Sequence, residues 1–277
     1  MSKKIVYIMM SLLVACVGCQ FKLMPEDSAA TQPLVSIARY DQLEYRYLTT
    51  GDFSALQEMN TEYPIETRTL IEDVVKVGDA TDPSINSKLL KFYQDTILQS
   101  IIADVEAEYA DIDDLNTGFS HAFTRLKKAF PDIRVPRIYT QISALDQSVV
   151  VGNGMIGISL DKYLGENYPV YKRYYSEQQR RQMNRQNILP DCLTFFLLSE
   201  FQIDKFEMRP QIERDLHMAK LQWVVNQLMG TRFYKTKYVC AIEHYMRHHP
   251  HSSYLELIEM TDFSRFKVCL LYTSDAA

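Results

Sequence analysis

The sequence predicts an α+β fold, predominantly α-helical, in which helices pack around a small antiparallel β-meander at about residues 137–160. Between Arg137 and Ser143 the chain alternates with the period of two that a half-buried strand shows. Three consecutive valines, Val149–Val151, follow, and β-branched side chains fit a pleated strand better than a helix. Nearly all of the chain on either side has apolar residues at helical spacing, so helices are expected to cover the strands.

A β-hairpin is predicted between the valines and the third apolar run, Met155–Leu160. Asn153-Gly154 lies between them, and an Asn-Gly pair supplies the positive φ angles of a type I′ turn. The stretch Gly152–Gly157 also matches the G-x-G-x-x-G fingerprint of dinucleotide-binding proteins. That fingerprint requires a helix to begin at the glycines, whereas the residues after them look extended. The hairpin is therefore preferred over a nucleotide site.

Five helices are predicted before the strands, from apolar residues at helical spacing and from signals at the helix ends. Asp52 is expected to cap a helix N-terminus, and Asp82-Pro83 to open another, because proline is favoured in the first turn. Gly51 and Gly78 are expected to end helices. The five helices cover residues 37–51, 52–60, 66–77, 82–109 and 113–130.

Further helices are predicted after the strands. Residues 176–186 are polar and basic, and we interpret them as a solvated helix face, with an acidic-ligand or phosphate site as the weaker alternative. Pro190-Asp191 then begins a nearly all-apolar helix, which must be buried. The helices after Pro190 cover residues 192–201, 209–229 (ending at Gly230), 233–248 and 254–260.

The N-terminus has the form of a bacterial lipoprotein signal. Two lysines precede an apolar run, Ile5–Ala15, which has the length of a signal-peptide core and is too short for a comfortable membrane span. Leu13-Val14-Ala15-Cys16 fits a lipobox, so we expect Cys16 to be lipidated, with Cys19 as the alternative. Acyl chains such as palmitate would hold the protein on a membrane without a spanning helix. An uncleaved anchor or a plain secretory signal is the competing interpretation.

Four segments are predicted along the chain. They are a lipoprotein signal peptide and lipobox at residues 1–19, a flexible tether at 20–35, one globular domain at 36–267, and a suspect non-native tail at 268–277. Removing residues 1–15 takes away both N-terminal lysines and changes the formal net charge from −5 to −7. A mildly acidic protein without a basic block has no electrostatic reason to bind nucleic acid.

The cysteines beyond the signal region are Cys192, Cys240 and Cys269, which are too few for a disulfide framework. Two separately buried thiols are preferred over a bridge between Cys192 and Cys240, although an oxidising envelope would permit that bridge.

Several stretches of the chain resemble the GldB-type gliding-motility lipoproteins. They are Leu145–Gly152, Gly157–Gly165, Tyr168-Pro169 and Ile188–Cys192, and the Leu-Asp-Lys-Tyr-Leu-Gly run at 160–165 is the specific part. The resemblance covers most of the chain after the signal region. It implies an envelope lipoprotein with a zincin-like core, similar to zinc-peptidase folds, and no established chemistry. Members of the family also occur in bacteria that do not glide.

The resemblance to zinc peptidases is expected to stop at the fold. In those enzymes the helix after the strands carries H-E-x-x-H, whose two histidines bind zinc. The helix at that place, residues 189–201, has no histidine, so we expect a pseudo-peptidase without a cofactor. His244 and His248 lie four residues apart and are weak metal candidates, interpreted as surface histidines. A hydrolase that uses them with Glu243 as non-standard zinc ligands is the alternative.

Asp161, Lys162 and Tyr163 form a possible partner-contact segment where the last strand ends. Under the preferred structural interpretation, the flanking leucines pack in the core and Gly165 takes a positive φ, while Asp161 and Lys162 lie on the surface. The sequence thus favours a lipid-anchored bacterial envelope protein, on the inner or outer membrane, that binds an unknown envelope protein and catalyses no reaction. No small-molecule ligand is expected.

Overall fold

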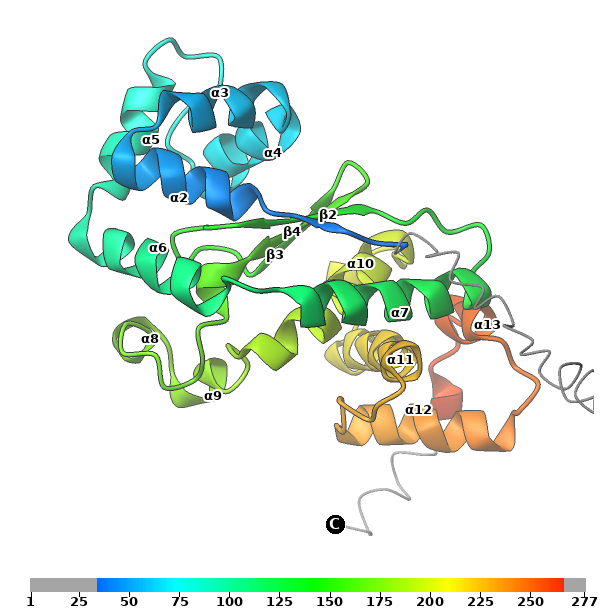
Figure 1. Cartoon of the computed structure of the whole chain (residues 1–277). Coiled ribbons are helices and arrows are strands. Elements are labelled where there is room, and N and C mark those ends of the chain that lie inside the picture. The colour runs from blue at the N-terminus through cyan, green and yellow to red at the C-terminus, as the bar shows by residue number, and fades with distance from the viewer. Residues whose placement is uncertain (1–33, 267–277) are drawn as a thin grey trace, which may run out of the picture. The chain divides into compact units, whose positions relative to one another are not determined.

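Four short strands form one mixed sheet in the computed structural model of the chain, which describes residues 34–266 (Figure 1). The strands lie in the order β1-β2-β4-β3, with β1 parallel to β2, β2 parallel to β4, and β3 antiparallel to β4. Their bounds are β1 Ile37–Ala38, β2 Arg137–Gln141, β3 Val149–Gly152 and β4 Met155–Ser159.

The prediction of an antiparallel meander is wrong, because β4 lies between β2 and β3. Parallel pairing of β2 with β4 places Ile138 beside Ile156, so β2 and β3 are not hydrogen-bonded to each other. Burial explains this order: every residue of β4 is buried, whereas the valines of β3 are only half-buried. The strand that loses most water on folding takes the central position. The short strand β1 was missed, because Ile37 was assigned to a helix.

The predicted hairpin is confirmed. Gly152 pairs with Met155 across a two-residue loop, in which Asn153 has a φ of 52° and Gly154 a φ of 71°, as a type I′ turn requires. The third glycine of the G-x-G-x-x-G match, Gly157, has a packing role. A Cβ atom there would lie 2.6 Å from the ring of Tyr139 on β2. A short 3-10 turn at Leu160–Lys162 follows β4, so the helix that a dinucleotide site needs does not begin there.

The predicted helices are confirmed in kind, but several differ in extent. The helix predicted over residues 66–77 is α-helical only to Thr69, continues as a π-helix, Leu70–Val74, and ends before Gly78. Of residues 176–186, only Glu177–Arg180 are α-helical. The helix predicted over residues 82–109 is two helices, because the Asp95 carboxylate accepts the N–H of Ile97 at 2.8 Å and starts a new helix. The short helix α8 was missed. The helices are α2 Tyr40–Thr50, α3 Phe53–Thr61, α4 Pro64–Thr69, α5 Ile85–Tyr93, α6 Thr96–Glu108, α7 Asp113–Ala129, α8 Tyr171–Tyr174, α9 Glu177–Arg180, α10 Ile188–Glu200, α11 Gln211–Met229, α12 Lys237–His248 and α13 Tyr254–Glu259.

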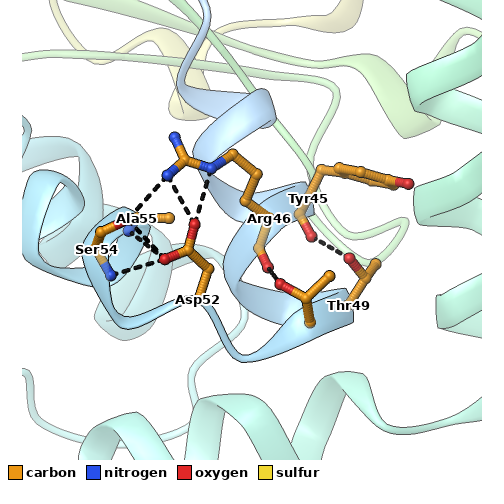
Figure 2. Close-up of polar contacts among 7 residues, drawn as sticks. Tyr45, Arg46, Thr49, Asp52, Ser54 and Ala55 are labelled. Carbon is orange, nitrogen blue, oxygen red and sulfur yellow. Dashed lines mark hydrogen bonds and ion pairs between the residues drawn. The ribbon is translucent and has the colours of Figure 1, made fainter.

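The corner between α2 and α3 is fixed by Asp52, which caps α3 as predicted (Figure 2). Its carboxylate accepts the Ser54 hydroxyl at 2.6 Å and the Ser54 N–H at 2.8 Å. Arg46, from the preceding helix, donates to the other carboxylate oxygen at 2.7 Å. These bonds hold the pKa of Asp52 below its ordinary value, and the bond from the Ser54 hydroxyl has the largest effect. Two helices are thereby joined at a single side chain.

Helix α10 lies against the sheet and inside the helical layers. It packs on β3 and β4, while α7 and α11 pack on α10 from the other sides. Its buried residues include Cys192, Phe196 and Leu197, as the apolar pattern predicted. The part of α10 that stays uncovered is therefore a narrow stripe, which runs beside β3.

Several predictions concern residues outside 34–266. The lipobox cysteines Cys16 and Cys19 and the suspect tail at 268–277 lie outside the described residues, so signal, tether and tail stay predictions. Within residues 34–266, none of the helices has both the length and the apolar character needed to cross a membrane.

Candidate functional site

An open groove of about 610 Å³ lies between β3 and the C-terminal half of α10. Val149 and Val151 line it from the strand, Phe195 and Leu198 from the helix, and Met208 from the loop that follows. Phe195 is 42 % exposed and Met208 is 82 % exposed, although both side chains are large and apolar. Exposed apolar side chains gathered at one groove are typical of a site where another molecule binds.

Among residues 34–266, no strand pairs with the outer edge of the strand beside this groove. β3 is the outermost strand, and Val150 pairs with Gly157 while Ser159 donates its N–H to the Ser148 carbonyl at 3.0 Å. In an antiparallel pair the hydrogen-bonded residues alternate, so Val149 and Val151 direct their N–H and C=O groups away from β4. The same two residues line the groove. Unpaired backbone groups and apolar side chains therefore meet at one place.

Asp191 extends the uncovered stripe of α10 toward its N-terminus. It lies four residues before Phe195, one helical turn away on the same face. The Tyr163 hydroxyl donates to Asp191 Oδ2 at 3.0 Å, and the Tyr234 hydroxyl lies 3.5 Å from Oδ1. Burial, its largest cause, raises the pKa of Asp191 to about 6. A carboxyl group that changes charge near neutral pH is thus held beside the groove.

The predicted partner-contact segment lies mostly in the interior. Asp161 is fully buried, which corrects the expectation that it lies on the surface. Its carboxylate accepts the Ser143 N–H at 2.8 Å and the Leu145 N–H at 2.6 Å, and these internal donors explain the burial. Tyr163 is also buried. Partner contact by the segment stays a prediction, and Lys162 is its one partly exposed member.

Lys162 and its neighbours hold the turn that precedes β3. Lys162 Nζ donates to the Leu145 carbonyl at 3.0 Å and to the Tyr175 hydroxyl at 2.9 Å. Ala144 and Leu145 both have positive φ angles, 53° and 68°, which are unfavourable for residues with side chains. The bonds from Lys162 and Asp161 therefore stabilise a strained turn.

Two further side chains bind the start of this turn from the helices. Glu44 on α2 accepts the Ile142 N–H at 2.7 Å, and the Tyr93 hydroxyl on α5 donates to the Ile142 carbonyl at 2.6 Å. Burial raises the pKa of Glu44 well above its ordinary value. These two side chains, together with Asp161 and Lys162 of the family-like run at 160–165, set the path of the chain into β3. Gly165 takes a φ of 104° and Leu160 is fully buried, as predicted.

The weak metal candidates lie on the surface of α12. His244 and His248 are exposed on α12, with ring centroids 4.4 Å apart, and Glu243 pairs with Arg232 and Arg247 instead. Within the described part of the chain, no group of three or more His, Cys, Asp or Glu side chains could hold a metal ion.

The remaining candidate groups are also accounted for. Cys192 and Cys240 are separate thiols, as predicted. Cys192 is buried, but Cys240 is only half-buried, so the prediction that both are buried is wrong for Cys240. In the basic stretch, Arg181 pairs with Glu177 at 2.5 Å and Arg185 with Asp114 at 2.6 Å. The exposed pair on α9 fits the interpretation as a solvated face. That interpretation is wrong for Arg185, which is 28 % exposed and also donates to the Glu108 and Asp111 carbonyls.

The groove itself was missed by sequence reasoning. The signal that could have indicated it is the spacing of Asp191, Phe195 and Leu198, which lie on one face of a helix that was expected to be buried throughout. An exposed phenylalanine within an apolar helix gives no sequence signal of its own, because burial depends on what packs against it.

Comparison with known proteins identifies the family. The family model described as gliding motility protein GldB matches residues 22–238, well over half of the chain. No curated protein and no solved structure matches the chain, so the predicted likeness to zinc-peptidase folds stays a prediction. By the extent of the family match, this chain belongs to the GldB family of gliding motility proteins.

Proposed function

We propose that this chain is a lipid-anchored protein of the bacterial cell envelope that binds an extended segment of another protein and catalyses no reaction. Three features support the proposal. The chain belongs to a gliding-motility family. The residues Leu13-Val14-Ala15-Cys16 fit a lipobox. Helix α10 carries no histidine, so it lacks the zinc-binding pair of a peptidase.

The observation that carries the proposal is the open edge of β3 beside an apolar groove. An extended segment can add to a sheet edge as a further strand, with backbone hydrogen bonds providing affinity and side-chain pockets providing specificity. Val149 and Val151 would supply the backbone groups, because their N–H and C=O point outward. Phe195 and Met208 would cover alternate side chains of the added segment.

The exposed edge of β3 lacks the usual protection of an edge strand. Natural proteins usually protect such edges with charged residues, prolines or bulges, because an open edge invites aggregation. The outward residues of β3 are valines, and no proline interrupts the strand. An unprotected edge of this composition fits a strand that is covered by a partner in the cell.

Photo-crosslinking in the native envelope tests the proposal. A benzoylphenylalanine in place of Phe195 lies in the groove, while the same residue in place of Phe53 is the matched control, because Phe53 is 80 % exposed on α3. A discrete crosslinked product is expected from position 195 and not from position 53. Equal products from both positions, or none from position 195, would contradict a binding site at the groove.

A proline at the edge provides the second arm of the test. Val151→Pro removes an outward N–H without removing a bond to β4, so the fold should persist while strand addition is blocked. Val151→Thr keeps the N–H and is the control. The crosslink from position 195 should disappear in Val151→Pro and remain in Val151→Thr, with unchanged melting temperatures. Retention of the crosslink in Val151→Pro would show that binding does not use the strand edge.

A further inference from the structure

Asp191 is a largely buried carboxyl group with no counter-charge. The groups around it are the hydroxyls of Tyr163 and Tyr234 and the neighbouring Cys192 thiol, all neutral at pH 7. No lysine, arginine or histidine of residues 34–266 forms an ion pair with it. Burying a charge without a partner is unfavourable, and folded proteins usually pair such groups.

Two connections place Asp191 beside the groove. Along α10, Asp191 and Phe195 are one turn apart on the uncovered stripe. Through side chains, Asp191 accepts the Tyr163 hydroxyl at 3.0 Å, and Tyr163 in turn hydrogen-bonds the Ser148 side chain. Ser148 directly precedes β3. Asp191 therefore lies near the Val149 end of the open strand edge.

We propose that the segment bound along β3 carries a lysine or arginine side chain that pairs with Asp191 at the end of an otherwise apolar stretch. The inference rests on the proposed strand addition and names the chemistry of the partner. Charge complementarity is its basis: a cation from the partner would supply the counter-charge that residues 34–266 do not provide. In a site of low dielectric constant, such a pair interacts more strongly than on an open surface.

Other uses of Asp191 fit the surroundings less well. A divalent cation would need further oxygen, nitrogen or sulfur ligands, and no cluster of three such side chains occurs in the described part of the chain. Glu207, the acid that lines the groove, is 84 % exposed and lies 3.4 Å from Arg214, so it already has a cation nearby. Asp191, one helical turn from Phe195, thus differs from Glu207 in forming no ion pair with any of residues 34–266.

Short peptides of defined charge test the inference on the full chain in detergent. The probes are fluorescein-labelled pentapeptides, Lys-Val-Thr-Val-Thr and Val-Thr-Val-Thr-Lys, because an added strand could run in either direction. In the matched control peptides, norleucine replaces lysine and keeps the length of the side chain without its charge. Fluorescence anisotropy measures the dissociation constant of each peptide.

We expect one of the lysine peptides to bind about tenfold more tightly than its norleucine control, which corresponds to about 1.4 kcal/mol. Asp191→Asn should abolish that preference and retain binding of the norleucine peptide, because asparagine still accepts the Tyr163 hydroxyl. Glu207→Gln, the control within the groove, should leave the preference unchanged. Melting temperatures of both variants verify that they fold.

The possible outcomes separate this inference from the proposed function. Equal binding of the lysine and norleucine peptides would overturn the pairing with Asp191 and leave strand addition intact. A preference that survives Asp191→Asn, or that disappears in Glu207→Gln, would overturn the assignment to Asp191. Failure of all four peptides to bind would overturn both proposals.

Discussion

Asp161 and Leu145 are joined by a hydrogen bond of 2.6 Å, from the Leu145 N–H to Asp161 Oδ2. The bond connects the end of β4 to the strained turn before β3, across sixteen residues of sequence. It explains why a charged residue in the family-like run is fully buried. It also indicates that this run supports the path of the open strand.

Asp161→Asn should lower the free energy of unfolding by roughly 2–3 kcal/mol, because a buried carboxylate that accepts two N–H groups is replaced by an amide with one acceptor oxygen. Urea unfolding followed by circular dichroism measures the change. Asp146→Asn, at an exposed acid in the same turn, is the control and should leave stability nearly unchanged. Equal effects of the two substitutions would show that the bonds from Asp161 do not support the turn.

Gly165→Val should lower the melting temperature by several degrees. Gly165 has a φ of 104°, and forcing a β-branched residue into the positive-φ region costs roughly 1–2 kcal/mol. No atom lies within 4 Å of an added Cβ, so the effect would come from the backbone alone. Gly152→Val is the control, because Gly152 has no positive φ and equally open surroundings. A Gly165→Val protein that melts like the parent would contradict this account.

Asp191→Asn should raise the free energy of unfolding, relative to the parent protein, more at pH 7.5 than at pH 4.5. The folded-state pKa of Asp191 is about 6 and its ordinary value is 3.8, so the folded state binds its proton more tightly than the unfolded state. The contribution of Asp191 to stability is therefore present at low pH and is lost as the pH rises through 6. Asparagine does not titrate, so its advantage over aspartate should grow by about 2 kcal/mol across this interval.

Urea unfolding of parent and variant at both pH values measures this difference. Asp204→Asn, at an exposed acid, is the control and should show little dependence on pH. An Asp191→Asn effect that is constant between pH 4.5 and 7.5 would mean that the carboxyl group does not titrate in this range.

Cys16→Ala should abolish incorporation of radiolabelled palmitate, while Cys19→Ala should retain it, because the residues before Cys16 fit the lipobox better. Labelling in cells followed by immunoprecipitation measures incorporation. The reverse pattern would move the anchor to Cys19. Labelling that persists when both cysteines are replaced, or that is absent from the parent, would remove lipid anchoring from the proposed function.

Protein purified without a histidine tag should contain less than about a tenth of an equivalent of zinc, since the usual ligand spacing is absent. Elemental analysis measures it. The exposed pair His244 and His248 is the candidate to exclude. Stoichiometric zinc that is lost in a His244→Ala/His248→Ala double variant would favour the hydrolase alternative.

Local chemistry allowed several features to be predicted from sequence. Gly51 and Gly230 end helices with φ angles near 70°, and Asp52 begins one, because each residue type suits that backbone position by itself. Asn153-Gly154 forms its turn for the same reason. The strand β3 and the apolar helix α10, the two walls of the candidate site, were predicted in this way.

Tertiary structure alone decided how these parts combine. Periodicity identified three strands between Arg137 and Ser159, but only competition for burial placed β4 in the centre and left β3 at the edge. Asp161 is buried because its donors lie in another turn, and Asp191 lies on the uncovered stripe of α10 because α7 and α11 cover the rest of that helix. Strand order and burial depend on contacts between residues distant in sequence, and local residue patterns do not encode those contacts.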